Sequence, residues 1–192
     1  MTSRPEAPAF AGVTHHSAAV PVVETTRLIL RAFRESDLDA WSAAMADPQV
    51  VRFLGGQPYT REETWRRAAL STGLWSMLGY GYWAVEAKED GRIVGQIGFA
   101  DFKRDISPNI EGRPEIGWIF APEAQGRGYA SEAALAALAW ADEALGRREI
   151  VAIISHANAA SIRIAEKGGF GEREEAVYKG EPILLFRRHL PL

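Results

Sequence analysis

The sequence contains no cysteine, and this absence removes two kinds of structure. Without thiols the chain forms no disulfide bond and offers no thiolate ligand to a metal ion. Any stability must therefore come from an ordinary packed core. A cysteine-free composition also fits the reducing interior of a cell, so we expect a cytoplasmic protein.

Long apolar runs and excess basic charge are also missing. No apolar stretch approaches the roughly 20 residues of a membrane-spanning helix. Acidic side chains number 25 against 22 basic ones, which gives a net charge of −3. We therefore expect no membrane insertion and no non-specific binding of nucleic acid. The adjacent His15 and His16 have no nearby partner, so no metal site is expected.

The composition that remains is typical of a globular protein, with 47% hydrophobic and 24% charged residues. A length of 192 residues fits one domain with a sizeable core, or one domain and a tail. Residues 1–23 are rich in Ala, Pro, Ser and Thr and predict a poorly ordered extension. Residues 24–192 predict a single domain.

Hydrophobic periodicity predicts alternating strands and helices within this domain. Asp90-Gly91 indicates a hairpin, and the spacing of Thr60 and Glu63 is that of a capping box at a helix start. The first half reads mostly as hairpins or direct connections, and the second half as strand, helix and strand. This order predicts an α/β or α+β domain with one central, partly antiparallel sheet. The expected strands are 27–33, 82–87, 93–100, 115–120, 150–155, one from 170, and 183–189; the expected helices are 36–47, 60–79, 131–145 and 158–167.

One short stretch lies between a buried strand and a long helix, and it reads Gln125-Gly126-Arg127-Gly128-Tyr129-Ala130. The first amides of a helix have no internal acceptor, and the helix dipole adds partial positive charge there. Because glycine has no Cβ atom, an anion can approach its backbone, and glycine itself adopts unusual dihedral angles at little cost. The arrangement is suited to a phosphate or pyrophosphate, although two glycines alone also fit a plain turn that starts a helix.

Five segments in order resemble the GNAT superfamily of acyl-CoA-dependent N-acyltransferases, and within it the RimJ/RimL branch. The glycine stretch has the Gln-x-x-Gly-x-Ala spacing of that superfamily's pyrophosphate loop. The resemblance covers about residues 24–192. Its other segments are Arg27-Leu28-Ile29-Leu30-Arg31, Gly95-Gln96-Ile97-Gly98, Glu115-Ile116-Gly117-Trp118, and Asn158-Ala159-Ala160-Ser161 with Glu166-Lys167-Gly168-Gly169-Phe170.

The resemblance implies a central mixed, mostly antiparallel sheet that splays between its fourth and fifth strands and is flanked by helices. Acetyl-CoA is then the acyl donor, with no metal. Its pantetheine arm pairs with backbone around Trp118, Ile119 and Phe120, and its pyrophosphate meets the amides of Gln125, Gly126, Arg127, Gly128, Tyr129 and Ala130. Asn158 matches the position that bonds the pantetheine, and it is also a good helix N-cap.

Acetyl transfer needs a neutral amine, whereas a free lysine-like amine has a pKa of roughly 10. A base must therefore take its proton, directly or through water. Glu115, at the start of the fourth expected strand, is the first candidate, because the superfamily often places a base there. An exposed carboxylate at a strand end is the plainer interpretation. Asp101, at the end of the preceding strand, is the second candidate.

Many superfamily members place a general-acid tyrosine seven residues after the asparagine, but here that position is Ala165. Ser161, one helical turn after Asn158, is the remaining nearby hydroxyl. It is expected to hydrogen-bond the leaving thiolate or the cofactor. A thiol has a pKa of only about 8.5, so its thiolate leaves without a strong acid.

We therefore expect an acetyl-CoA-dependent N-acetyltransferase, a monomer or homodimer, that acts on a primary amine. The amine belongs either to a protein amino terminus or to a small molecule. Two alternatives stay open: transfer of a longer acyl group such as succinyl, and a non-catalytic CoA-binding sensor. Acceptor specificity is expected in variable regions at residues 53–75, 80–83 and 101–113 and at Tyr178. Arginines at 52, 61, 66 and 67 favour an anionic acceptor, or else form a solvated helix face.

Overall fold

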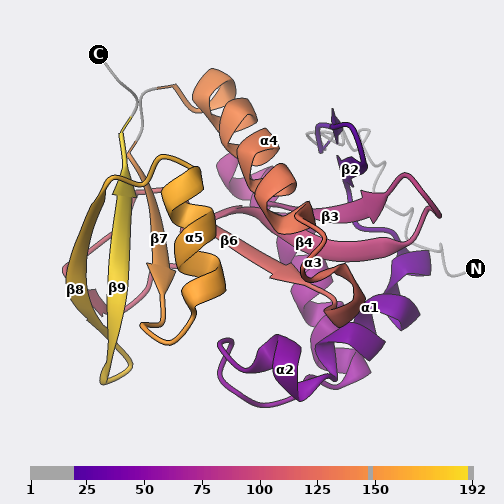
Figure 1. Cartoon of the computed structure of the whole chain (residues 1–192), viewed down its shortest axis with the longest axis horizontal. Helices are drawn as coiled ribbons and strands as arrows, with labels where there is room; N and C mark the ends of the chain where they lie inside the picture. Colours follow the sequence, from indigo (N-terminus) through magenta and orange to yellow (C-terminus); the bar gives the residue numbers. More distant parts are fainter. Residues whose placement is uncertain (1–19, 147–148, 190–192) are drawn as a thin grey trace, which may run out of the picture.

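The protein is built on one central sheet (Figure 1). The computed structural model describes residues 20–146 and 149–189. Within these residues the sheet has nine strands in the order β1-β2-β3-β4-β6-β7-β9-β8-β5. The strands are β1 (Val23–Glu24), β2 (Leu28–Arg31), β3 (Tyr82–Ala87), β4 (Ile93–Ala100), β5 (Ile106–Ser107), β6 (Glu115–Phe120), β7 (Ile150–Ile154), β8 (Glu172–Tyr178) and β9 (Glu181–Arg188).

All neighbouring strands are antiparallel except β6 and β7. This parallel pair registers at one position, Glu115 opposite Val151. Beyond it the two strands diverge, as Figure 1 shows. The predicted mixed, mostly antiparallel sheet with a splay between the fourth and fifth expected strands is therefore confirmed.

Helices cover both faces of the sheet. Helices α4 and α5 lie on one face, and α1, α2 and α3 lie on the other (Figure 1). The alanine-rich sequence of α4 lets the helix approach the strands closely. The last turn of α5 also packs tightly, because a Cβ on Gly168 would lie 2.8 Å from Leu138 Cδ1 of α4. The helices are α1 (Leu38–Met45), α2 (Pro48–Val51), α3 (Arg61–Leu78), α4 (Tyr129–Ala144) and α5 (Ala159–Lys167).

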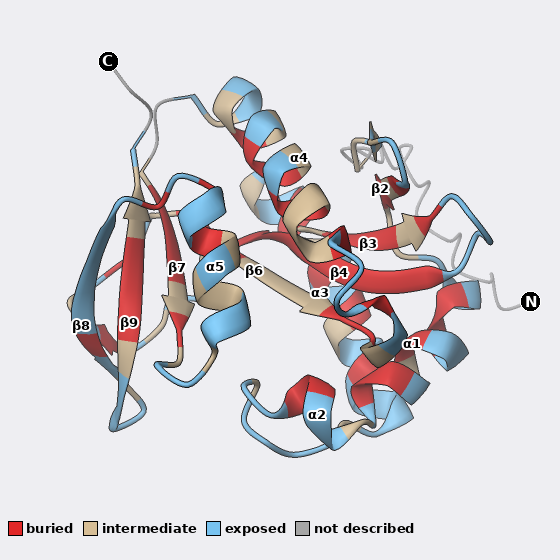
Figure 2. Ribbon diagram, in the orientation of Figure 1, coloured by how far each residue is buried: buried red, intermediate tan, exposed pale blue. Residues whose placement is uncertain are grey.

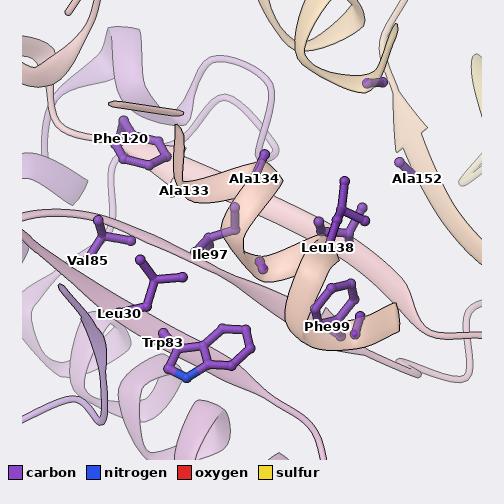
Figure 3. Packing of buried hydrophobic residues seen from close by; sticks show 14 of the residues in the cluster. Leu30, Trp83, Val85, Ile97, Phe99, Phe120, Ala133, Ala134, Leu138 and Ala152 are labelled. Carbon is purple, nitrogen blue, oxygen red and sulfur yellow. The ribbon is translucent and has the colours of Figure 1, made fainter. Parts of the chain in front are cut away.

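The main hydrophobic core lies between the sheet and α4. Leu30, Trp83, Ile97 and Phe99 point from the strands toward Ala133, Ala134 and Leu138 of the helix (Figure 3). Strands β3, β4 and β7 are mostly buried, β9 is buried only in its middle, and much of β8 is exposed (Figure 2). A second cluster, including Trp41 and Val51, fills the opposite face under α1 and α2. No helix in the described part of the chain combines the length and the apolar character needed to cross a bilayer.

Regular structure starts slightly before the expected domain boundary. Val23 already pairs with Leu30, and the Pro21 carbonyl accepts a hydrogen bond of 2.8 Å from the Trp83 indole. Both residues fall inside the stretch 1–23 that was assigned to an extension, so the domain takes in at least its last few residues. Residues 1–19 lie outside the described residues. Most of the predicted extension at residues 1–23 therefore stays a prediction.

Besides β1, helix α2 and strand β5 were not predicted from the sequence. Helix α2 follows Asp47, whose side chain accepts a hydrogen bond from the Gln49 amide. Strand β5 arises within the polar stretch that was expected to be a loop, and it pairs with β8 at the far edge of the sheet. The connection between β4 and β6 therefore crosses from one half of the sheet to the other, and it brings residues near 101–113 toward Tyr178.

Candidate active site

The glycine stretch forms a tight turn at the start of α4. Gly126 and Gly128 have φ angles of +73° and +78°, the left-handed region that favours glycine. Among the described residues, the amides of Gly126, Arg127 and Gly128 have no backbone or side-chain acceptor. The first amides of α4 continue this row, because helix geometry leaves them without partners. The turn therefore presents consecutive N–H donors at the positive end of a 16-residue helix.

Two arginines flank this turn. The Arg27 guanidinium donates to the Arg127 carbonyl at 2.9 Å and pairs with Glu132 at 2.6 Å, and it stacks on the Tyr129 ring. Arg127 stacks on the same ring and pairs with Glu89 at 2.7 Å. A surface hollow of about 330 Å³ lies beside them, lined by Thr26, Arg27, Lys88, Glu89, Arg127 and Tyr129. The turn thus adjoins a surface where cations are held in fixed positions.

The unpaired edge of β6 leads toward this turn. The Ala121 amide donates to the Val94 carbonyl on β4, and strand geometry gives alternate residues the same direction. The backbone groups of Trp118 and Phe120 consequently point away from β4, toward the side where β7 has diverged. Those of Ile119 face β4, and its side chain packs against the core under α1 and α2. Gln125 holds the end of the strand, since its side-chain amide reaches the Phe120 carbonyl at 3.4 Å.

The start of α5 faces this edge of β6. Asn158 caps the helix by accepting a hydrogen bond of 3.2 Å from the Ser161 amide. The Trp118 indole N–H donates to the Ser161 hydroxyl oxygen at 3.1 Å, which joins β6 to α5 across the splay. Ser161 keeps its own proton available for donation. Ala165, at the position of the family tyrosine, is fully buried.

Glu115 is not an exposed carboxylate at a strand end. Its side chain is buried and accepts two hydrogen bonds from the Arg104 guanidinium, at 2.6 and 2.9 Å. Burial raises the pKa of Glu115, and the two contacts with Arg104 offset this rise only in part. The carboxylate therefore has a raised proton affinity, which a general base requires, but it also has a firm partner.

Arg104 is held from several sides. Its guanidinium donates to the Tyr178 hydroxyl at 2.8 Å and lies between the rings of Phe102 and Tyr178, at 4.7 and 4.9 Å from their centroids. Tyr178 belongs to β8, whereas Glu115 belongs to β6. Arg104 therefore ties the two halves of the splayed sheet together at the point where they separate.

Asp101, the second candidate base, organises the loop after β4. Its carboxylate accepts hydrogen bonds from the Lys103 side chain at 2.6 Å and from the Gly112 amide at 2.9 Å. Burial alone would raise the pKa of Asp101, but these contacts outweigh it and lower the pKa. Asp101 is consequently a weaker base than Glu115.

Tyr82 lies across two glycines of the sheet. It pairs with Gly98 on β4, and Gly98 pairs with Gly117 on β6. A Cβ at Gly117 would lie only 2.5 Å from the Tyr82 hydroxyl, so only glycine leaves room for the phenol there. Burial raises the pKa of Tyr82, the Glu115 charge raises it further, and Arg104 and Arg67 oppose the rise. Tyr82 therefore stays neutral above the middle of β6.

The sequence analysis named the turn, Glu115, Asn158 and Ser161 as site residues, but it gave Arg27, Tyr82 and Arg104 no individual role: Tyr82 and Arg104 appeared only within the regions 80–83 and 101–113. Each of these three acts through partners far along the chain, so no local pattern marks them. The glycines of the Gly95-Gln96-Ile97-Gly98 and Glu115-Ile116-Gly117-Trp118 segments were the available signal for Tyr82.

Within residues 20–146 and 149–189, no cluster of three or more His, Asp or Glu side chains is arranged to hold a metal ion.

Comparison with known proteins agrees with this geometry. Residues 27–171 match the family model described as an acetyltransferase (GNAT) domain. YoaA of Bacillus subtilis, named an uncharacterized N-acetyltransferase, is 29% identical over 151 residues, which cover 78% of this chain and 82% of YoaA. A GnaT-family acetyltransferase of Bordetella pertussis superposes with a TM-score of 0.76 at 31% identity, over 88% of this chain and 99% of that one.

A more distant match is the ribosomal L7/L12 N-acetyltransferase RimL, whose structure contains coenzyme A. It superposes with a TM-score of 0.66 at 17% identity, over 88% of this chain and 98% of RimL, a likeness that shows the fold alone. The family model spans β2 to β7, the glycine turn, α4 and α5. This chain therefore belongs to the GNAT family of acetyltransferases.

Proposed function

We propose that this protein transfers an acetyl group from acetyl-CoA to a primary amine. One observation carries the proposal: the unpaired edge of β6 leads directly into the row of free amides at the start of α4. An extended chain with amide groups at one end and a pyrophosphate at the other matches this track. Acetyl-CoA has that form, and the RimL structure, which has the same fold, contains coenzyme A.

The residues proposed to hold the donor follow from this track. The backbone of Trp118 and Phe120 pairs with the pantetheine arm, and Ile119 contributes packing because its backbone is engaged with β4. The amides of residues 125–130 receive the pyrophosphate. Asn158 keeps its side-chain NH₂ group for the pantetheine, because its cap uses only the oxygen. When bound, the donor supplies a thioester carbonyl that an amine attacks.

The protein's part in the reaction is to take a proton and to stabilise charge. Glu115 is the proposed base, acting directly or through water, because its pKa is raised toward the working range of a base. The N–H on the free edge of β6 near Phe120 that the pantetheine arm does not use suits the developing oxyanion. Ser161 is proposed to hydrogen-bond the departing sulfur, in place of the tyrosine that Ala165 replaces.

Release of free thiol from acetyl-CoA across a panel of primary amines tests this proposal. We expect amine-dependent thiol release and one acetylated amine product per thiol. Succinyl-CoA in the same assay tests the longer-acyl alternative, which would be favoured by faster turnover of that donor. Saturable CoA binding without thiol release from any amine would overturn the enzymatic proposal and favour the sensor alternative.

Ser161→Ala is expected to lower turnover by roughly ten- to a hundred-fold, with little change in stability. A hydrogen bond to a charged group contributes about 1.5–3 kcal/mol, which corresponds to that change in rate. The measurement is kcat per folded molecule with acetyl-CoA at saturation.

Trp118→Phe is the companion variant for Ser161. It removes the indole N–H that donates to the Ser161 oxygen but leaves the hydroxyl in place. If Ser161 serves the sulfur, Trp118→Phe should reduce turnover less than Ser161→Ala does. Equal turnover in wild type and Ser161→Ala would reduce Ser161 to a structural partner of Trp118.

A further inference from the structure

The arginines near the α3 face of the sheet differ in their partners. Arg61 pairs with Asp39 and Arg66 pairs with Glu62, so two charges of α3 are matched on its exposed side. Arg52 after α2 is exposed. Arg67 is half-buried, and no carboxylate in the described part of the chain forms an ion pair with it. A half-buried guanidinium without an anion is costly unless something else matches its charge.

Tyr59 holds Arg67 in position. The guanidinium carbon lies 4.8 Å from the centroid of the Tyr59 ring, and one nitrogen donates to the Tyr59 hydroxyl at 3.4 Å. Tyr59 is itself fixed, because its hydroxyl donates to the Leu54 carbonyl at 3.0 Å. This stacking fixes the plane of the guanidinium and leaves most of its five N–H donors unused.

Arg67 lies on the side of α3 that faces β4. Ser71, one turn later in the helix, accepts a hydrogen bond of 2.6 Å from Gln96 of β4, so this part of α3 rests on the sheet. Gln96 pairs with Ile119 of β6. Tyr82 of β3 is the diagonal neighbour of Gln96 on this face of the sheet, and its hydroxyl lies over Gly117 of β6.

The Tyr82 hydroxyl is the second polar group without a partner here. Tyr82 is half-buried as a residue, and no described side chain or backbone group forms a hydrogen bond with its hydroxyl. The remaining cation near Tyr82 is Arg104, whose charge Glu115 already matches. Arg67 and Tyr82 therefore offer an unmatched positive charge and a free hydroxyl on the face of the sheet that carries Gly117, two residues after the proposed base Glu115 on β6.

We infer that Arg67 and the Tyr82 hydroxyl bind a carboxylate of the acceptor, so that the acceptor is a small amine carrying a carboxylate close to its amino group. This inference rests on the proposed function. A guanidinium matches a carboxylate in both shape and charge, and a phenol adds one donor. An amino acid fits this description. A protein amino terminus does not, because its neighbouring carbonyl is a neutral amide.

The test compares amino acids with the amines that lack only the carboxylate. Suitable pairs are phenylalanine with phenethylamine, leucine with isopentylamine, and lysine with cadaverine. In the wild-type protein, for the amino acid with the highest kcat/KM of the three, we expect that value to be at least tenfold higher than the value for its decarboxylated partner. Equal or better use of the decarboxylated amines would overturn the inference while leaving the proposed acetyltransferase intact.

Substitution of Arg67 separates binding from catalysis. Arg67→Gln should raise KM for the amino acid roughly ten- to a hundred-fold, change kcat little, and leave the decarboxylated amine unaffected. Arg67→Lys should restore part of the loss, and Tyr82→Phe should give a smaller rise in KM. Arg66→Gln is the matched control, one residue away on the same helix, and should behave as wild type. Identical KM values in the Arg67 and Arg66 variants would overturn the assignment.

A readout that needs no turnover keeps this inference distinct from the proposed function. With CoA present, amino acids from the panel should raise the melting temperature of the wild-type protein, and this shift should be absent in Arg67→Gln and retained in Arg66→Gln. A shift without thiol release would support the carboxylate site and contradict catalysis. Thiol release from decarboxylated amines, with no shift in melting temperature from any amino acid, would support catalysis and contradict the carboxylate site.

Discussion

Gly128→Val is expected to abolish the rise in melting temperature that acetyl-CoA causes in the native protein. At a donor concentration of 100 times Kd, binding stabilises the folded state by about 2.7 kcal/mol. For a chain of this size that corresponds to roughly 5–10 °C. Gly128 is the residue before the first turn of α4, and its φ of +78° is one that valine resists. A side chain here also fills the space beside Arg27, whose Nη2 would lie 3.4 Å from the new Cβ.

The backbone strain itself needs a control, because valine at a positive φ destabilises any protein. Gly79, at the end of α3, has nearly the same φ of +76°, and a Cβ there would meet no atom within 4 Å. Gly79→Val should therefore lower the melting temperature of the free protein by a similar amount while keeping the full shift with acetyl-CoA. An undiminished shift in Gly128→Val would remove the turn from the donor site.

Glu115→Gln should lower turnover by roughly 10²–10⁴ and leave the affinity for acetyl-CoA nearly unchanged, if Glu115 is the base. The loss should shrink at high pH, where more of the amine is already neutral. In the wild-type protein the raised pKa of Glu115 places the acidic limb of the pH–rate profile above 4.5, the ordinary pKa of a glutamate. Activity should rise with pH through that limb, because ionisation creates the base.

The ion pair with Arg104 complicates this variant. Removing one partner of a buried pair leaves the other uncompensated, so Glu115→Gln should also lose stability. Turnover must therefore be normalised to folded protein. A second variant, Arg104→Met, distinguishes loss of the base from loss of the ion pair, because it breaks the pair and keeps the Glu115 carboxylate. Without its guanidinium the pKa of Glu115 should rise further, and the acidic limb should move to higher pH.

Two other carboxylates complete this comparison. Glu111→Gln changes an exposed side chain of the same loop and should leave turnover unchanged. Asp101→Asn tests the competing base directly. If Glu115→Gln retained turnover within a factor of two of wild type, the proton would pass to Asp101 or to water. If Arg104→Met instead lost activity with no change in the pH profile, Glu115 would act only by positioning Arg104.

The local structure of the proposed donor site was largely predictable from the sequence. The turn at residues 125–130 is a local structure: two glycines at positive φ and a following helix are enough to create free amides. The cap at Asn158 and the spacing to Ser161 depend on one helical turn. Strand β6 reads as a buried apolar run. Each of these features depends on residues only a few positions apart, so pattern and propensity describe them well.

The acceptor side was predicted only as a set of separate regions. Residues 53–75, 80–83 and 101–113 and Tyr178 were named, but no pattern said which side chains meet. Arg104 contacts Tyr178 because β5 carries the loop after β4 across to β8, and the sequence of β5 gave no strand signal. Glu115 was expected to be either an exposed carboxylate or a base, and its burial with Arg104 depends on that same crossing.

By itself, therefore, the sequence determined the order of the longer strands and helices, the glycine turn at residues 125–130 and the family resemblance, because short-range backbone geometry and side-chain periodicity encode them. Tertiary structure decided the charge state of the site. Burial and long-range partners set the pKa of Glu115 and match the charge of Arg104, and within residues 20–146 and 149–189 they leave Arg67 without a carboxylate. Electrostatic energies depend on distance through space and on desolvation, and neither quantity follows from how far apart two residues are in the sequence.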